Sequence, residues 1–129
     1  MAKTKKEKLR ENVLNKCEGR CGYCGILLNG IRWHIDHVEP VERISEYKKG
    51  KGYVQTGKMA YPENDIFENM MPSCPSCNIQ KHSFGLEEFR KNIQNKLVQL
   101  EKQTQYRIAK RYGLLKETPI EIIFYFEKN

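Results

Sequence analysis

The sequence contains no apolar run that approaches the roughly 20 residues needed to cross a membrane as a helix. Its opening stretch is charged and lacks the apolar segment followed by small residues that marks a secretory signal. Internal repeats and low-complexity linkers are also absent. With 129 residues, the chain has little length to spare for a second domain. These absences predict a single cytoplasmic domain with no membrane partner.

Basic charge is abundant but unevenly distributed. The formal net charge is +7, from 23 Lys and Arg residues against 16 Asp and Glu residues. Residues 1–16 carry six basic side chains against two acidic ones, and residues 81–111 carry eight against three. Clustered basic charge favours a polyanion, because each Lys or Arg that meets a phosphate releases a condensed counterion. The alternative to a nucleic-acid partner is a well-solvated surface.

Four of the five cysteines fall in two C-x-x-C pairs: Cys21 with Cys24, and Cys74 with Cys77. Each pair can grip one ion from a single turn, and two pairs complete a tetrahedral sulfur site for Zn²⁺. Four thiolates without an imidazole favour a structural zinc that clamps two distant segments together. The alternatives are redox pairs or unrelated thiols, but nothing in the sequence supplies the larger α/β domain of a redox protein. Cys17 is interpreted as a spare thiol.

Apolar periodicity predicts helices in three places. Residues 5–16 predict a basic helix. A second helix should begin at or near Cys77. From residue 86 onward, apolar side chains recur at helical spacing, in one helix or in successive pieces that end by Gly113.

Strands are predicted at residues 32–38 and 66–71. The β-branched and aromatic tail, residues 118–129, favours a terminal strand. Residues 41–65 are rich in Gly and Lys and look irregular. The combination of helices and strands predicts an α+β fold.

The stretch IRWHIDHVEP concentrates titratable groups in a short strand: His34, Asp36 and His37. Asp36 and His37 would point to opposite faces of a regular strand. For both to reach one substrate group, the strand must end or bend, and Pro40 just downstream is consistent with that. His34 shares a face with Asp36 and could orient substrate or simply be a polar strand residue.

These residue types suit phosphodiester cleavage. A hard divalent ion such as Mg²⁺ or Mn²⁺ prefers oxygen ligands and keeps positions open for water and a substrate phosphate. Asp36 and the amide oxygen of Asn78 are such ligands, although Asn78 could instead cap a helix. His37, neutral near pH 7, can accept a proton from the attacking water.

Together these motifs resemble the HNH nuclease family. The likeness covers about half the chain and is carried by the cysteine pairs with Asp36, His37, Pro40, Asn69, Asn78 and Lys81. The resemblance implies a ββα-metal (His-Me finger) core stapled by a four-cysteine zinc site, with flanking helices. It implies that His37 is the general base and that Asp36 and Asn78 hold the catalytic metal. It also implies that Asn69 bonds backbone across the loop to hold His37.

One nuclease domain would then span residues 1–129. It would comprise a basic N-terminal helix (1–16), the zinc-stapled core (17–82) and a helical extension with a terminal strand (83–129). Lys81, one helical turn after Asn78, is a candidate phosphate contact. The lysines of the segment after the first strand could enter a DNA groove or form a solvated loop: Lys48, Lys49, Lys51 and Lys58.

The sequence therefore predicts a metal-dependent DNA endonuclease of a phage, mobile-element or restriction type. The first alternative is a non-catalytic zinc-stapled DNA-binding module, and the second is a toxin nuclease domain with an inhibitor partner. Double-stranded DNA is the expected substrate, with RNA left open. A homodimer would let two active sites cut both strands.

Overall fold

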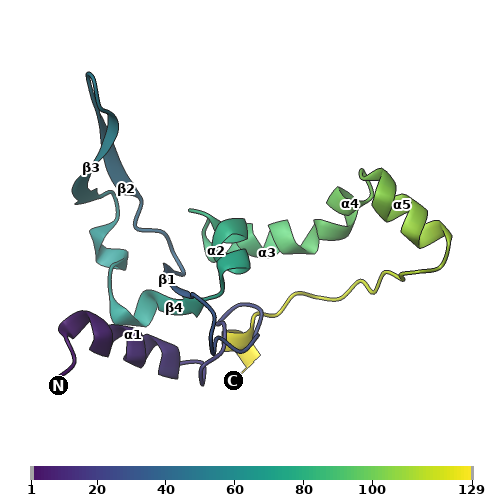
Figure 1. The fold of residues 1–129 in the computed structure, drawn as a ribbon, viewed down its shortest axis with the longest axis horizontal. Helices are drawn as coiled ribbons and strands as arrows, with labels where there is room; N and C mark the ends of the chain where they lie inside the picture. Colours follow the sequence, from purple (N-terminus) through teal and green to yellow (C-terminus); the bar gives the residue numbers. More distant parts are fainter. Residues whose placement is uncertain (1, 129) are drawn as a thin grey trace.

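The computed structural model describes residues 2–128 and has a mixed α+β fold (Figure 1). Helix α1 follows a Thr4 cap whose side chain accepts a hydrogen bond from the Glu7 amide. The extension predicted from residue 86 is helical but broken into three pieces. The helices are α1 (Lys5–Asn15), α2 (Pro75–Lys81), α3 (Leu86–Gln94), α4 (Lys96–Leu100) and α5 (Thr104–Arg111). None of those described is long and apolar enough to cross a membrane.

The first strand pair lies at the centre of the molecule. Strand β1 (His34–His37) runs antiparallel to β4 (Met70–Ser73), with Asp36 opposite Met71. Strand β1 is shorter than predicted. Strand β4 starts later than predicted, because Phe67–Asn69 forms a 3₁₀ turn before it. All four residues of β4 are buried, so this pair belongs to the core.

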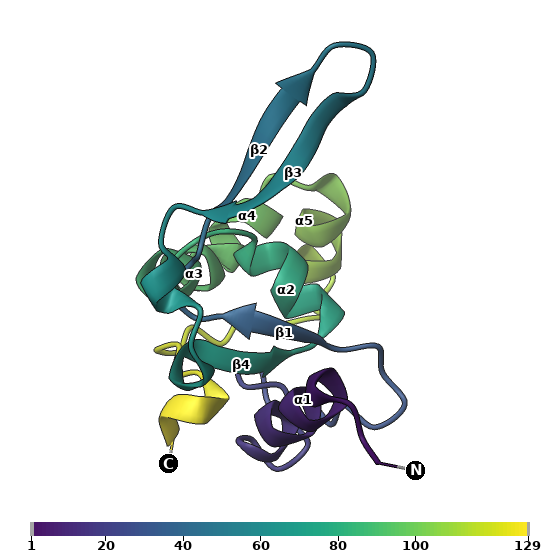
Figure 2. The same cartoon turned by 90° about the vertical axis from the view of Figure 1, so that its left-hand side faces the viewer.

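The second strand pair corrects the prediction that residues 41–65 are irregular. Strands β2 (Arg43–Lys48) and β3 (Gly52–Met59) form an antiparallel hairpin that projects from the body (Figures 1 and 2). At its turn, the Lys51 amide donates to the Lys48 carbonyl, and Gly50 adopts a φ of +84° that favours glycine. Every residue of β2 is exposed. The sequence therefore shows no alternation of apolar and polar residues there.

Aromatic rings form much of the hydrophobic core. Tyr23 meets Phe89 edge to face with ring centroids 5.4 Å apart. Phe124 stacks on Phe89 at 5.1 Å. All three rings are almost fully buried. Such pairs add about 0.5–1.5 kcal/mol each beyond the burial of their area, so the core joins the segment around Tyr23, helix α3 and the C-terminal segment.

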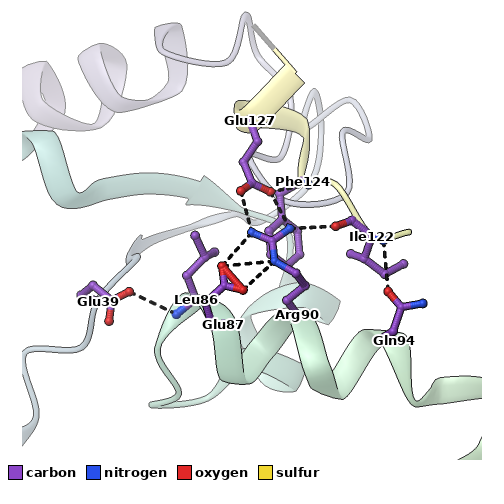
Figure 3. A network of polar contacts seen from close by, with 8 residues as sticks. All are labelled: Glu39, Leu86, Glu87, Arg90, Gln94, Ile122, Phe124 and Glu127. Carbon is purple, nitrogen blue, oxygen red and sulfur yellow. Dashed lines mark hydrogen bonds and ion pairs between the residues drawn. The ribbon is translucent and has the colours of Figure 1, made fainter. Parts of the chain in front are cut away.

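The predicted terminal strand is wrong within the described residues. The segment before Phe124 forms no strand, and Tyr125–Lys128 forms a 3₁₀ turn; residue 129 lies outside the description. The segment runs beside a helix, so no neighbouring strand completes a ladder. It is held instead by two side chains of α3, Arg90 and Gln94 (Figure 3).

The Arg90 guanidinium is the centre of that attachment. It donates to the Ile122 carbonyl at 2.7 Å and forms an ion pair with Glu127 at 2.6 Å (Figure 3). It also pairs with Glu87 on its own helix at 2.8 Å. Near the start of the same helix, the Glu39 carboxylate accepts from the Leu86 amide at 3.3 Å. Helix α3 therefore links the chain after β1 to the C-terminal segment.

Candidate metal centre and the adjoining cavity

A tight turn presents the first cysteine pair. The Cys21 amide donates to the Ile26 carbonyl, and the Gly25 amide donates to the Cys21 carbonyl. Gly25 adopts a φ of +81°, which favours glycine. The Gly22 amide donates to the Pro72 carbonyl of β4 at 2.7 Å. The turn, hereafter the knuckle (residues 20–27), is thereby fastened to the central strand pair.

The second pair meets the first as the spacing predicted. The four Sγ atoms of Cys21, Cys24, Cys74 and Cys77 all lie within 4.8 Å of one another. Those of Cys24 and Cys74 are 3.7 Å apart. A tetrahedron with Zn–S bonds of about 2.3 Å has edges of about 3.8 Å. The cluster is therefore compatible with a structural metal such as zinc.

The hydrogen bonds of the cluster favour one thiolate, Cys21, while burial raises the pKa of Cys24 and the hydrogen bond to Cys21 raises that of Cys77. A hydrogen bond from the Cys77 side chain is the main cause that lowers the pKa of Cys21 to about 4, with help from the Cys74 amide. A thiolate, not a thiol, is the form that binds metal. Cys17 lies outside the cluster, with its Sγ 3.5 Å from the Met71 Sδ, and burial raises its pKa. Its interpretation as a spare thiol agrees with this position.

Asp36 lies on β1, next to the knuckle. Its side chain is buried, with 8% of the residue exposed. Its Oδ2 accepts a hydrogen bond from the Tyr23 hydroxyl at 2.5 Å and lies 3.1 Å from the Lys81 Nζ. Burial, and then the negative charge of Asp36, raise the pKa of Tyr23, so the phenol remains a donor. A residue inside a C-x-x-C pair thus holds the carboxylate in place.

Lys81 is placed differently from its prediction as a phosphate contact. It is 1% exposed, and its ammonium also donates to the carbonyls of His37 at 2.8 Å and Phe84 at 2.9 Å. With Asp36, these three acceptors use all three donors of the ammonium group. In this arrangement Lys81 fixes helix α2 against the end of β1 and has no donor left for a substrate.

His37 is the last residue of β1. The strand therefore ends at the point where the sequence analysis expected an end or a bend. Its Nε2 lies 2.9 Å from the Asp65 Oδ1. An open cavity of about 350 Å³ lies against this strand end. The described residues that line it are Ile35, Asp36, His37, Pro40, Val41, Glu42, Arg43, His82 and Ser83. Asp36 and His37 therefore both line this cavity, although successive side chains of a regular strand point to opposite faces.

Asn69 bonds backbone across the loop, which is the contact expected of it. Its Oδ1 accepts from the Glu39 amide at 3.0 Å, and its Nδ2 donates to the Glu39 and Asn64 carbonyls at 2.8 Å. Its own carbonyl accepts from the Val38 amide at 2.9 Å. These bonds hold the chain that directly follows His37.

Two other predicted site residues, Asn78 and His34, are not among the described residues that line the cavity. Asn78 is half-buried on α2, three residues before Lys81 and so on the same helix face. It does not line the cavity within the part of the chain that is described. His34 lies at the opposite end of β1 from His37 and pairs with Ser73.

The four predicted substrate lysines all lie on the hairpin or its turn and are exposed: Lys48, Lys49, Lys51 and Lys58. By contrast, some basic groups of the N-terminal segment serve packing. The Arg10 guanidinium lies 4.0 Å from the centroid of the Trp33 ring. Lys16 donates to the Phe67 and Met70 carbonyls. The exposed hairpin is therefore the clearer basic surface.

Sequence reasoning missed two partners of the site residues and gave little weight to one residue that lines the cavity. Tyr23 and Asp65 were not predicted to contact Asp36 and His37. For His82, the sequence left open a phosphate contact but favoured a role on the helix surface. Tyr23 lies inside the first C-x-x-C pair, but that motif fixes only the cysteines, and Asp65 belongs to no spaced motif. His82 has a signal visible only in the structure, a φ of +51° at the end of α2.

Comparisons with family models, with curated proteins and with solved structures find no match for this chain. A function must therefore be inferred from the chemistry of the cysteine cluster, Asp36 and His37, and from the cavity beside them.

Proposed function

We propose that this chain is a metal-dependent DNA endonuclease of the HNH type. The observation that carries the proposal is that Asp36 and His37 line one open cavity at the end of a short strand. The four-cysteine cluster and the buried Lys81 hold helix α2 against that strand end. A carboxylate and an imidazole at one open site suit hydrolysis of a phosphodiester.

The residues of the site fit a hard divalent ion. Oδ2 of Asp36 has two partners, which leaves Oδ1 as the oxygen for a metal. Asn78 lies on the helix face that Lys81 directs toward Asp36, and the proposal requires its amide oxygen to reach the ion although Asn78 does not line the cavity. A bound Mg²⁺ or Mn²⁺ would neutralise charge on the phosphate and its leaving oxygen. Zinc is the proposed occupant of the four-cysteine cluster.

His37 would act as the general base through Nδ1. Its Nε2 is paired with Asp65, so an Nε2–H tautomer leaves Nδ1 free to take a proton from water. Asp65 would orient the ring, and Asn69 would hold the backbone after it. The roles are then divided, because Asp36 and Asn78 bind metal, His37 moves a proton, and Asp65 and Asn69 position His37.

One observation favours a second candidate, the non-catalytic zinc-stapled DNA-binding module. The Asp36 carboxylate already has a structural use, because Tyr23 and Lys81 both bind it. Because removing one partner of a buried ion pair is costly, this carboxylate has a structural role whether or not the chain is a catalyst. The two candidates differ in whether DNA is cut.

Cleavage of supercoiled plasmid with Mg²⁺, with Mn²⁺ or with no added divalent ion tests the proposal. Wild type should cut only with added metal. His37→Ala should cut about 10²–10⁴-fold more slowly, as expected for loss of a general base. Asn78→Ala should lose cutting, whereas Asn95→Ala, at an exposed helix end, should not. Binding without metal-dependent cutting would replace the endonuclease with the binding module.

The products also bear on assembly and substrate. Nicked circles indicate single-strand cuts, while direct linear product indicates two active sites and hence the expected homodimer, which sedimentation would detect.

RNA incubated in parallel tests the preference for DNA. The cytoplasmic location remains an expectation from the sequence.

Asp65 needs a test that separates orientation from folding. Asp65→Ala should lower kcat while KM changes little, because it removes the partner of His37 Nε2. Asp65→Asn keeps an acceptor oxygen and should restore most of kcat. Equal losses in both variants, or none in either, would contradict the positioning role.

A further inference from the structure

The β2–β3 hairpin has two different faces. Directly paired residues of an antiparallel pair lie on the same face. Ser45 pairs with Gln55, and Tyr47 pairs with Tyr53. These four residues form one face, hereafter the ribbon face. Glu46 and its partner Val54 lie on the opposite face of the hairpin.

The ribbon face is polar, neutral and open to solvent. All four of its residues are exposed, and Tyr47 and Tyr53 keep 64% and 78% of their surface accessible. The two rings meet edge to face with centroids 5.4 Å apart. A hydroxyl, an amide and two phenols both donate and accept hydrogen bonds. No core burial accounts for placing two tyrosines there.

Positive charge surrounds this face. The hairpin carries five basic side chains against one acidic side chain. Lys48, Lys49 and Lys51 lie at the turn, and Arg43 and Lys58 lie toward the base. The neutral ribbon face therefore lies between two groups of basic side chains, which suits a polyanion that extends along the hairpin.

The hairpin also begins at the candidate site. Arg43, the first residue of β2, lines the same cavity as Asp36 and His37. From there the strands extend away from the body (Figure 2). A polymer with a phosphate in the cavity would therefore continue along the hairpin.

We propose that the hairpin enters the major groove of duplex DNA and that the ribbon face reads base edges there. The major groove, about 12 Å wide, admits a two-stranded ribbon. In such a groove, Gln55 can bond adenine through two hydrogen bonds, and Ser45 can bond several bases. The lysines at the turn contact phosphates. This role for the hairpin rests on duplex DNA as the partner in the proposed function, but it requires no cleavage.

Binding without cutting isolates base reading from catalysis. Zinc-loaded full-length protein, with no Mg²⁺ or Mn²⁺ added, is used to select duplexes from a randomised library. Wild type should enrich a sequence motif. Gln55→Ala should reduce the preference for one base by about 5- to 150-fold in fluorescence anisotropy with matched and mismatched duplexes. Gln105→Ala, an exposed glutamine on α5, is the matched control and should keep the preference.

The lysines should behave differently. Replacing Lys48, Lys49 and Lys51 by Ala should weaken all duplexes alike and reduce the salt slope of binding by about one per lysine. Amide chemical shifts of β2 and β3 should move on titration with the selected duplex, a readout that needs no variant. All hairpin variants should have the melting temperature of the wild type.

Several results would overturn the inference. They are the absence of a motif, a motif unaffected by Gln55→Ala, unmoved hairpin amides, and tighter binding to single strands through Tyr47 and Tyr53. The two proposals fail separately. Motif binding without cutting removes the endonuclease and keeps the ribbon, whereas cutting without a motif removes only the ribbon.

Discussion

The two strand pairs share an antiparallel geometry but differ in what stabilises them. The β1–β4 pair is short and its β4 residues are all buried, with the knuckle, α1 and α2 around it. The β2–β3 pair is longer, and β2 is exposed throughout. Burial of one face fixes strand register strongly, while an isolated hairpin is only marginally stable in water. The first pair therefore suits a rigid site, and the second suits a surface that adapts to a partner.

Loss of a metal from the four-cysteine cluster should have the largest effect, because the cluster joins the segments that surround the first pair. Structural zinc contributes about 10–16 kcal/mol of binding free energy in small zinc domains, against about 5–15 kcal/mol of total stability. Cys74→Ser should therefore lose the ion and unfold near room temperature. Metal analysis and circular dichroism measure this. Cys17→Ser is the matched control and should keep the ion; equal metal content in the two variants would contradict the cluster.

Lys81→Met should be the next most damaging change. It leaves Asp36 buried without its ion-pair partner, which typically costs about 3–5 kcal/mol. Urea denaturation gives the value. Lys58→Met changes an exposed lysine of the hairpin and should stay within about 0.5 kcal/mol of wild type. A small effect of Lys81→Met would mean that the buried pair does not hold α2 to β1.

Met71 and Ile44 compare apolar side chains in the two pairs. Met71 is buried on β4, whereas Ile44 on β2 is 42% exposed. Met71→Ala should lower the free energy of unfolding by about 2–5 kcal/mol. Ile44→Ala should cost under about 1 kcal/mol. The same urea series measures both, and similar losses would show that the hairpin is packed more closely than its exposure indicates.

Gly50→Ala should have the smallest global effect. The positive φ of Gly50 would cost about 1–2 kcal/mol with a side chain present. Because the turn lies at the tip of the exposed hairpin, this cost should open β2–β3 locally. Hydrogen exchange should quicken in β2 and β3 and stay unchanged in β1 and β4. Faster exchange in both pairs would contradict their independence.

The same difference explains which features could be predicted. Cysteine spacing predicted the four-sulfur cluster, because two short turns can be recognised without knowing the chain between them. The apolar positions of β1 and the helices follow from burial. The hairpin was missed because exposed strands carry no apolar alternation. The terminal strand was wrong because the tail packs on helix α3 through Phe124 and Ile122, while Ile120 and Ile123 remain exposed.

The motif residues of the candidate site could be found from the sequence, but the residues that contact them could not. Asp36 and His37 stand out because they are adjacent and unusual in an apolar strand. Tyr23 and Asp65 do not, since only folding brings each to its partner. Lys81 was expected at the surface because lysine is rarely buried without a partner. Its partner, Asp36, was assigned another role.

The hydrogen bond from Tyr23 to Asp36 has a consequence for regulation. Tyr23 lies between two of the four cysteines, and its hydroxyl orients the carboxylate at the cavity. Thermodynamic linkage is reciprocal, so an ion that orders the knuckle strengthens binding at Asp36, and a ligand at Asp36 tightens the knuckle by the same factor. Loss of an ion from the four-cysteine cluster would therefore also weaken ligand binding at Asp36.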